Sequence, residues 1–372
     1  MRQFEIKKQD EGQKLKKLCF RILDRAPQSF TYKMLRKKNI TLNDKKADGD
    51  EVLHYGDIVK FYLADETFDK FSSHSKAENR SAGDTVNRSD DVSSSNVSSS
   101  NNTGPGNNTY NKNRLSEEDI IYIDDDIMLI NKKYGVLSQK AKADDISVNE
   151  MMLSYLKEKG LWNESTFKPS VCNRLDRNTT GIILAGISIK GLQFLTGAVR
   201  DRKIDKFYRT ICTGRFEKSC RVRSYLSKDE NNNTVKIMNE SEFRSAGSPD
   251  NYNQIETEFR PVSYSVDGQL TLLEVKLITG KSHQIRAQLA SLGHPIIGDR
   301  KYIGDAELTS SKSRNGQAGR MKKDIYGLKA QLLHAYKISF REGCEKYTGK
   351  DFTCPYPEAF NRIIKQYFVK YD

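Results

Sequence analysis

One aspartate in this sequence, Asp176, stands where a carboxylate can do chemistry. It lies between Arg174 and Arg177 in the charged segment CNRLDRNTTG, which runs directly into the apolar stretch 182–185. Loops at strand ends, held by a rigid sheet, often carry catalytic groups. Positive charges on both sides favour the ionised carboxylate that a nucleophile or a base requires. Taken alone, the same pattern is more often a structural ion pair.

Three further segments carry side chains of reactive types. They are KFYR at 206–209, GKSHQIR at 280–286 with its continuation to GHPIIGD at 293–299, and LLHA at 332–335. Each has an ordinary explanation by itself, with His283 and His334 as core histidines and Tyr208 as sheet packing. The segments together, in this order, are much harder to obtain by chance. They favour an active site built around Asp176.

The elements that must position these segments alternate between strands and helices. Apolar runs and period-two alternation predict strands at 120–123, 127–131, 206–213, 254–265, 271–277 and 332–340. Helical spacing predicts helices at 148–159, with Ser147 as its cap, at 189–201 and at 282–292. Strands that are not in simple βαβ order predict an α+β fold with a mixed sheet.

A smaller structured block precedes this region. It begins with a strand at 2–7 and a helix whose apolar stripe runs from Leu15 to Leu23. A second short helix is predicted at 31–38, capped by Ser29 or Thr31. Strands at 40–42 and 58–63 complete the block, and the first of them leads into a turn at Asn43-Asp44.

The second short helix is basic and is a candidate RNA-binding element. Its charges are Lys33, Arg36, Lys37 and Lys38. A solvated basic face is the ordinary explanation of such a run. Here the order of helix, basic helix, short hairpin and the strand in HYGDIVKFYL resembles a small αL RNA-binding domain of the S-four type, and the resemblance implies that the basic helix lies against RNA phosphates.

Composition divides the chain into three parts. The segment 69–115 is rich in Ser, Asn, Asp and Gly and has almost nothing apolar to bury, so it is predicted to be a flexible linker. The predicted domains are therefore 1–68, which binds RNA, and 116–372, which carries the chemistry. A second polar stretch, 305–323, is predicted to be a surface insertion.

Net charge and cysteine content limit the kinds of partner and the cellular compartment that the sequence predicts. The net charge of +13 favours a polyanion such as RNA, because Lys and Arg release counterions when they neutralise phosphates. Six cysteines without any C-x-x-C pair predict free thiols and no metal site. No apolar run reaches the length of a membrane span and no signal-peptide core opens the chain, so a cytoplasmic location is expected.

The motifs resemble those of the RluA-type pseudouridine synthases. NRLDRNTTGIILAG is similar to the family motif H-R-L-D-R-x-T-S-G, and GKSHQIRAQLASLGHPIIGDRKY to the G-R-T-H-Q-I-R … G-H-P-I-x-G-D … Y-G segment. KFYRTICTG and LLHAYKISF resemble two further landmarks, and the first block resembles an S-four-type αL RNA-binding domain. The resemblance implies an α+β catalytic domain with a mixed, mainly antiparallel sheet. The chain departs from the pattern at Asn173, Thr180, Lys281 and Lys133.

The resemblance also implies roles for individual residues. Asp176 matches the catalytic aspartate, Tyr208 the tyrosine that stacks on the target base, and Arg286 the arginine that pairs with the carboxylate. Arg174 matches the residue that fills the space left by the flipped base. The family uses no cofactor or metal. A monomer acting on RNA is implied, with 23S rRNA favoured and tRNA possible as substrates.

Other hypotheses stay open at this point. Asp176 can react at the anomeric carbon, react at the uracil ring, or act as a base through a glycal. A non-catalytic RNA-binding assembly factor is the alternative from another class, although such a protein would be expected to lose Asp176, Tyr208 or Arg286. A hydrolase is disfavoured because no serine or cysteine elbow and no metal-ligand set accompanies the aspartate.

Overall fold

The computed structural model describes residues 1–73, 114–162, 167–229, 234–302 and 326–368. The chain forms two compact units, Met1–Arg114 with Asn163–Phe167 and Leu115–Trp162 with Lys168–Asp372. Nearly all of the predicted linker, and the whole of the predicted insertion at 305–323, lie outside the described residues.

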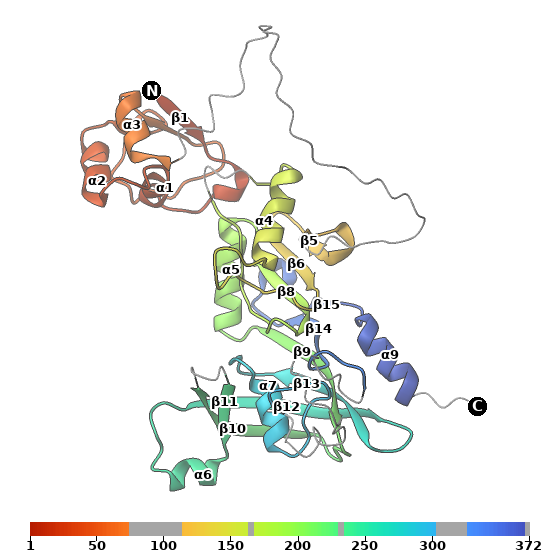
Figure 1. Ribbon diagram of the computed structural model, residues 1–372. Helices are drawn as coiled ribbons and strands as arrows, with labels where there is room; N and C mark the ends of the chain where they lie inside the picture. Colours follow the sequence, from red (N-terminus) through yellow and green to blue (C-terminus); the bar gives the residue numbers. More distant parts are fainter. Residues whose placement is uncertain (74–113, 163–166, 230–233, 303–325, 369–372) are drawn as a thin grey trace, which may run out of the picture. The chain divides into compact units, whose positions relative to one another are not determined.

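The first unit is a small helix-and-sheet fold (Figure 1). Its helices are α1 (Leu15–Ile22), α2 (Gln28–Arg36) and α3 (Asp65–Phe71), and its strands are β1 (Arg2–Glu5), β2 (Ile40–Leu42), β3 (Lys45–Lys46) and β4 (Ile58–Phe61). The strands are antiparallel in the order β1-β4-β2-β3. Asn43 and Asp44 join β2 to β3 with φ of 50° and 61°, the left-handed values that a tight hairpin turn requires.

The basic helix begins earlier than the sequence predicts. It spans Gln28–Arg36, with Pro27 at its N-cap, so the predicted cap at Ser29 or Thr31 is wrong. The fixed φ of proline and its missing N–H suit a helix start, where the first N–H groups have no partner in the helix. Thr31 lies inside the helix and is buried. Lys37 is the C-cap, and Lys38 follows with a φ of 64°.

The second unit is built on one large sheet. Its strands are β5 (Ile120–Ile123), β6 (Ile127–Lys132), β7 (Ser170–Val171), β8 (Thr180–Gly186), β9 (Ile204–Thr213), β10 (Cys220–Asp229), β11 (Thr234–Met238), β12 (Asn253–Tyr264), β13 (Leu270–Leu277), β14 (Leu333–Phe340) and β15 (Asp351–Thr353). The main order is β11-β10-β12-β13-β9-β14-β8-β6-β5, with β15 beside β14 and β7 beside β8. Among the described strands only β8 and β14 pair in parallel, so the predicted mixed, mainly antiparallel α+β fold is confirmed.

Five helices accompany this sheet in the described part of the unit. They are α4 (Val148–Glu158), α5 (Ile189–Arg200), α6 (Glu240–Ser245), α7 (Gln284–Ser291) and α9 (Glu358–Tyr367). The predicted cap of α4 is confirmed, because Ser147 Oγ accepts a hydrogen bond from Glu150 N. Short 3-10 turns at Glu117–Asp119 and Glu345–Tyr347 complete the unit. Strands β7, β10, β11 and β15 and helices α3, α6 and α9 were not predicted.

The sheet is buried on both faces around β6 and β8. Met128 and Ile130 of β6 join the apolar cluster that contains Met152 of α4. Ile127 and Leu129 point the other way, into the cluster that contains Leu195 of α5. Side chains alternate between the faces of a strand, so α4 and α5 cover opposite faces, as Figure 1 illustrates. This double burial holds the start of β8, and hence the loop before it, rigidly.

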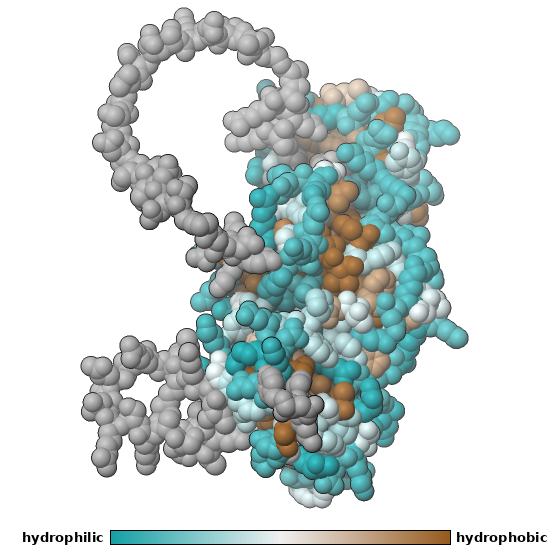
Figure 2. Space-filling model, turned by 90° about the vertical axis from the view of Figure 1, so that its right-hand side faces the viewer, coloured by the Kyte–Doolittle hydropathy of each residue, from teal (hydrophilic) through white to brown (hydrophobic). Residues whose placement is uncertain are grey.

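Much of the outer surface is polar. Figure 2 shows hydrophilic residues over most of one face, with apolar residues gathered in smaller groups between them. Among the described residues, no helix is both long and apolar enough to cross a membrane. All six cysteines are free.

Candidate active site

Asp176 lies in the loop between β7 and β8, and side chains from other segments hold the backbone on both sides of it. Ser138 Oγ accepts a hydrogen bond from Leu175 N and donates one to Leu175 O, both at 2.9 Å. Lys132 Nζ donates to Arg177 O at 2.8 Å. The residues before and after Asp176 are thus fixed by contacts that span 37 and 45 positions of the chain.

Two residues of the motif tie this loop to the sheet. Asn173 Oδ1 accepts a hydrogen bond from Leu184 N at 2.8 Å, which gives this departure from the family pattern a structural role. Gly181 has a φ of 111°, and a Cβ there would lie 2.2 Å from Ala335 O on the parallel strand β14. Only glycine permits this close approach of β8 to β14.

Arg286 joins two carboxylates at the centre of the site. Its Nη1 donates to Asp176 Oδ2 at 2.9 Å, while Nε and Nη2 donate to the two oxygens of Asp299 at 2.6 and 2.9 Å. The Asp299 side chain is 1% exposed and that of Asp176 is 25% exposed. Burial alone would lower the pKa of Arg286, but the hydrogen bonds and charges of Asp299, and then of Asp176, raise it above its ordinary value. The guanidinium therefore remains charged and presents one N–H to Asp176.

His283 approaches the same carboxylate oxygen from the loop before α7. Its Nε2 lies 3.8 Å from Asp176 Oδ2, and its Nδ1 is 2.8 Å from the Tyr302 hydroxyl. Burial lowers the pKa of His283, although the charge of Asp176 opposes this, so the imidazole is neutral at pH 7. His283 has a φ of 56°, an unfavourable conformation for a residue with a side chain, and such strain clusters at functional sites.

Tyr302 orients the imidazole of His283. The Tyr302 hydroxyl accepts a hydrogen bond from Val235 N at 3.0 Å, which fixes its position. Its contact with His283 Nδ1 turns the other ring nitrogen, Nε2, towards Asp176. Arg286 and His283 both approach Oδ2 of Asp176, and neither contact involves Oδ1. Asp176 also lines the cleft described below.

Tyr208 and Lys132 complete the surroundings of Asp176. Burial first, and the nearby charge of Asp176 second, raise the pKa of Tyr208, which stays a neutral phenol. Lys132 is fully buried, and burial lowers the pKa of its ammonium to about 7 against the opposing effect of Asp176. Lys132 and Ser138 were missed by reasoning from sequence, and Asp299 was placed in a motif without a role. The only signal for Lys132 was a lysine that closes the apolar strand IMLINK.

These groups open onto a cleft of about 950 Å³. The structure brings Asp176, Tyr208 and Arg286 together in its lining, and Arg174 lies exposed at its edge. Further lining cations are Arg177, Lys206, Lys281, Arg300, Lys301 and Lys329. Such a concentration of positive charge suits a polyanionic substrate. The other predicted RNA-binding residues, Lys33, Arg36, Lys37 and Lys38, are exposed and belong to the first unit.

His334 of the fourth motif is structural. It is 1% exposed, its Nδ1 lies 2.8 Å from Thr180 Oγ1 and its Nε2 lies 3.3 Å from Cys354 Sγ. It therefore ties β14 to the first residue of β8. Burial lowers the pKa of His334 to about 4.

This lowered pKa makes the stability of the second unit pH-dependent. Below the ordinary histidine pKa of about 6.5 the unfolded chain binds a proton that the folded chain does not take up until about pH 4. The contribution of His334 to the free energy of unfolding is therefore at its maximum above pH 6.5. We expect roughly 2–3 kcal/mol of the free energy of unfolding to be lost between pH 6.5 and 4. Urea denaturation across this range measures it. His334→Gln should flatten the dependence, whereas the exposed control His54→Gln should not.

Comparison with known proteins gives consistent matches. Residues 126–291 match the family model described as RNA pseudouridylate synthase. An uncharacterised RNA pseudouridine synthase of Mycoplasma genitalium is 26% identical over 91% of this chain and 88% of its own length. Ribosomal large subunit pseudouridine synthase D of Borreliella burgdorferi is 27% identical over 67% of this chain and 68% of its own.

A further relative and a solved structure extend the comparison. Ribosomal large subunit pseudouridine synthase C of Vibrio vulnificus is 24% identical over 95% of this chain and 92% of its own length. Among solved structures, human RNA pseudouridylate synthase domain containing 4 is 19% identical, with a TM-score of 0.49 over 66% of this chain and 91% of that one.

Proposed function

We propose that the chain is an RluA-type RNA pseudouridine synthase, as the matched family model and the relatives support, and that it isomerises specific uridines of large-subunit ribosomal RNA with Asp176 as the catalytic carboxylate. The observation that carries the residue assignment is the arginine bridge, in which Arg286 holds Oδ2 of Asp176 in the lining of the cleft and leaves Oδ1 without that contact. The substrate assignment rests on relatives named for the large ribosomal subunit.

The reaction sets what the site must accomplish. The bond between C1′ of the ribose and N1 of uracil breaks, a bond between C1′ and C5 forms, C5 loses its proton and N1 gains one. A uridine inside folded RNA must first leave its stack, at an energetic cost of a few kcal/mol. Arg174, exposed at the edge of the cleft, fills the gap in the RNA, and Tyr208 stacks on the extruded base.

Oδ1 of Asp176 then acts on the bound nucleotide. It attacks the anomeric carbon or the uracil ring, or it removes a proton on the way to a glycal, and the hydrogen bond from Arg286 to Oδ2 orients the carboxylate for each route. Tyr208, whose raised pKa keeps it a neutral phenol, has a hydroxyl that can donate a hydrogen bond to the bound nucleotide. The uracil stays enclosed while it rotates.

The first unit is part of the same proposal, as an S-four-type domain that places α2 against RNA. A monomer acting in the cytoplasm, where ribosomal RNA is modified, completes it.

Transcriptome-wide mapping of pseudouridine tests the function. Cells with and without the gene are compared, and the deletion is complemented with wild type or Asp176→Asn. We expect a site in 23S rRNA to disappear and to return only with wild type. A lost site in tRNA would reassign the substrate, and no lost site in any RNA, despite good expression, would favour the non-catalytic assembly factor.

The basic helix gives a separate prediction. Replacing Lys33, Arg36 and Lys37 by glutamine is expected to weaken RNA binding. Each lost phosphate contact should reduce the slope of log K against log salt by about 0.7–0.9. Fluorescence anisotropy over a salt series measures it. Lys70→Gln, which removes an exposed charge from α3 of the same unit, is the control. A slope unchanged in the triple variant would place α2 away from the RNA.

A further inference from the structure

Lys206 is a half-buried cation in the cleft, and the described part of the chain offers it no partner. It precedes Tyr208 by two residues on β9, so both side chains point to the same face of the sheet, and both line the cleft. Its Nζ lies 3.7 Å from the position that a Cβ on Gly280 would take. Among the described residues, no carboxylate or carbonyl accepts a hydrogen bond or forms an ion pair with this ammonium.

The neighbouring carboxylate in the sequence, that of Asp205, does not pair with Lys206. Asp205 points to the opposite face of β9, where it pairs with Lys276 at 2.9 Å and also with Arg341. Burial, and then the charge of Arg202, lower the pKa of Lys206, while Asp205 opposes this only weakly. Withdrawing an ammonium from water without a partner is unfavourable, so the free protein is destabilised at this position.

We propose that Lys206 binds a backbone phosphate of the RNA adjacent to the uridine held at Tyr208. The anion supplies the missing partner, and water excluded by the RNA strengthens the contact. Two residues along a strand span about 7 Å, close to the length of one nucleotide in a single strand. The site therefore takes a phosphodiester one step away from the reacting base. This inference rests on the proposed function, because it takes the base at Tyr208 as its reference.

A functional role for Lys206 predicts opposite effects on stability and on binding. Lys206→Gln removes a buried, unpartnered charge, so its melting temperature is expected to equal or exceed that of wild type. The same variant should bind RNA several-fold more weakly, because it loses one phosphate contact. A lysine with a merely structural role would lower stability when replaced and leave binding unchanged.

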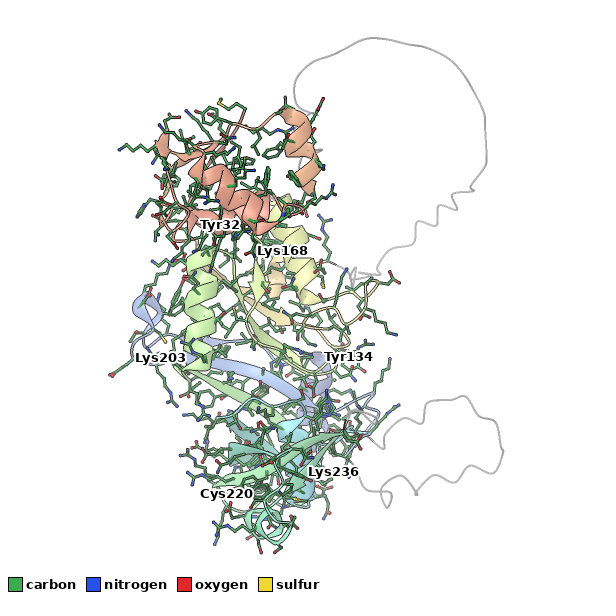
Figure 3. All side chains as sticks on the ribbon, turned by 90° about the vertical axis from the view of Figure 1, so that its left-hand side faces the viewer. Tyr32, Tyr134, Lys168, Lys203, Cys220 and Lys236 are labelled. Carbon is green, nitrogen blue, oxygen red and sulfur yellow. The ribbon has the colours of Figure 1, made fainter. Side chains whose placement is uncertain are left out.

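The experiment uses the full chain and an in vitro transcript of 23S rRNA. Binding is measured over a salt series for wild type, Lys206→Gln, Lys206→Arg and the control Lys203→Gln. Lys203 is exposed, three positions earlier, and lies outside the lining of the cleft (Figure 3). We expect the slope of log K against log salt to fall by about 0.7 in Lys206→Gln, to recover in Lys206→Arg and to stay unchanged in Lys203→Gln.

Measuring pseudouridine formation in the same samples distinguishes failure of the phosphate contact at Lys206 from failure of the proposed function. If wild type forms pseudouridine and Lys206→Gln keeps both the salt slope and the KM of wild type, the phosphate contact is wrong and the enzyme assignment stands. If wild type forms none on any RNA tested, the proposed function fails first. A lower melting temperature in Lys206→Gln, with an unchanged slope, would make Lys206 a structural residue.

Discussion

Asp176→Asn is expected to abolish pseudouridine formation, with a loss of at least about 10⁴-fold in single-turnover rate, as for other residues that act directly on the substrate. An amide has the shape of the carboxylate, and its carbonyl can still accept a hydrogen bond from Arg286 Nη1. It carries no charge, however, and is neither a nucleophile nor a base at neutral pH. RNA affinity should stay within a few-fold of wild type, because the phosphate-binding cations of the cleft are unchanged.

The fold should survive this substitution. Arg286 keeps its two-pronged pair with buried Asp299, so no buried charge is left alone. Asp201→Asn, in an exposed pair with Arg200, is the matched control and should keep full activity. Circular dichroism and RNA binding should both match wild type. Loss of folding in Asp176→Asn would mean that the carboxylate holds the loop rather than reacts.

Arg286→Gln is expected to damage both stability and activity. Removing the guanidinium leaves Asp299, which is 1% exposed, as a buried and unpaired carboxylate. Breaking a buried ion pair in this way costs about 3–5 kcal/mol of the free energy of unfolding. The variant also releases Asp176 from its orienting contact, and we expect a loss in kcat of at least about 10²-fold.

Two further variants show whether the effect of Arg286→Gln comes from the buried bridge. Arg244→Gln breaks an exposed pair with Glu240 on α6 and should cost less than about 1 kcal/mol. Arg286→Lys keeps the charge but cannot span both carboxylates, so it should rescue only part of the stability and little of the activity. Urea denaturation and single-turnover assays give the two readouts. A fully active Arg286→Gln that is also stable would exclude the bridge from the mechanism.

The sequence alone predicted the elements that bury a regular apolar pattern. The strand Ile120–Ile123 agrees with its prediction at both ends, and helix α4 begins after its predicted cap at Ser147. Strand β10 was missed although Arg221, Val222 and Arg223 alternate as in a strand, because two arginines in three residues make the segment strongly charged. The charges on its outer side are satisfied across the sheet by Glu256 of β12, at 2.8 and 2.7 Å, and no local pattern indicates such a partner.

For the candidate active site, the residue types in the sequence motifs were enough to predict what kind of chemistry the site could perform. Asp176, Tyr208 and Arg286 stand in motifs that could be identified by order and spacing, since a motif is local in the chain. The tertiary structure decided which oxygen of Asp176 bonds to Arg286, which nitrogen of His283 faces Asp176, and that Lys132 and Lys206 are withdrawn from water. These properties depend on burial and on contacts between residues far apart in the chain, such as the 110 positions that separate Asp176 from Arg286. Only the folded sheet brings those residues together.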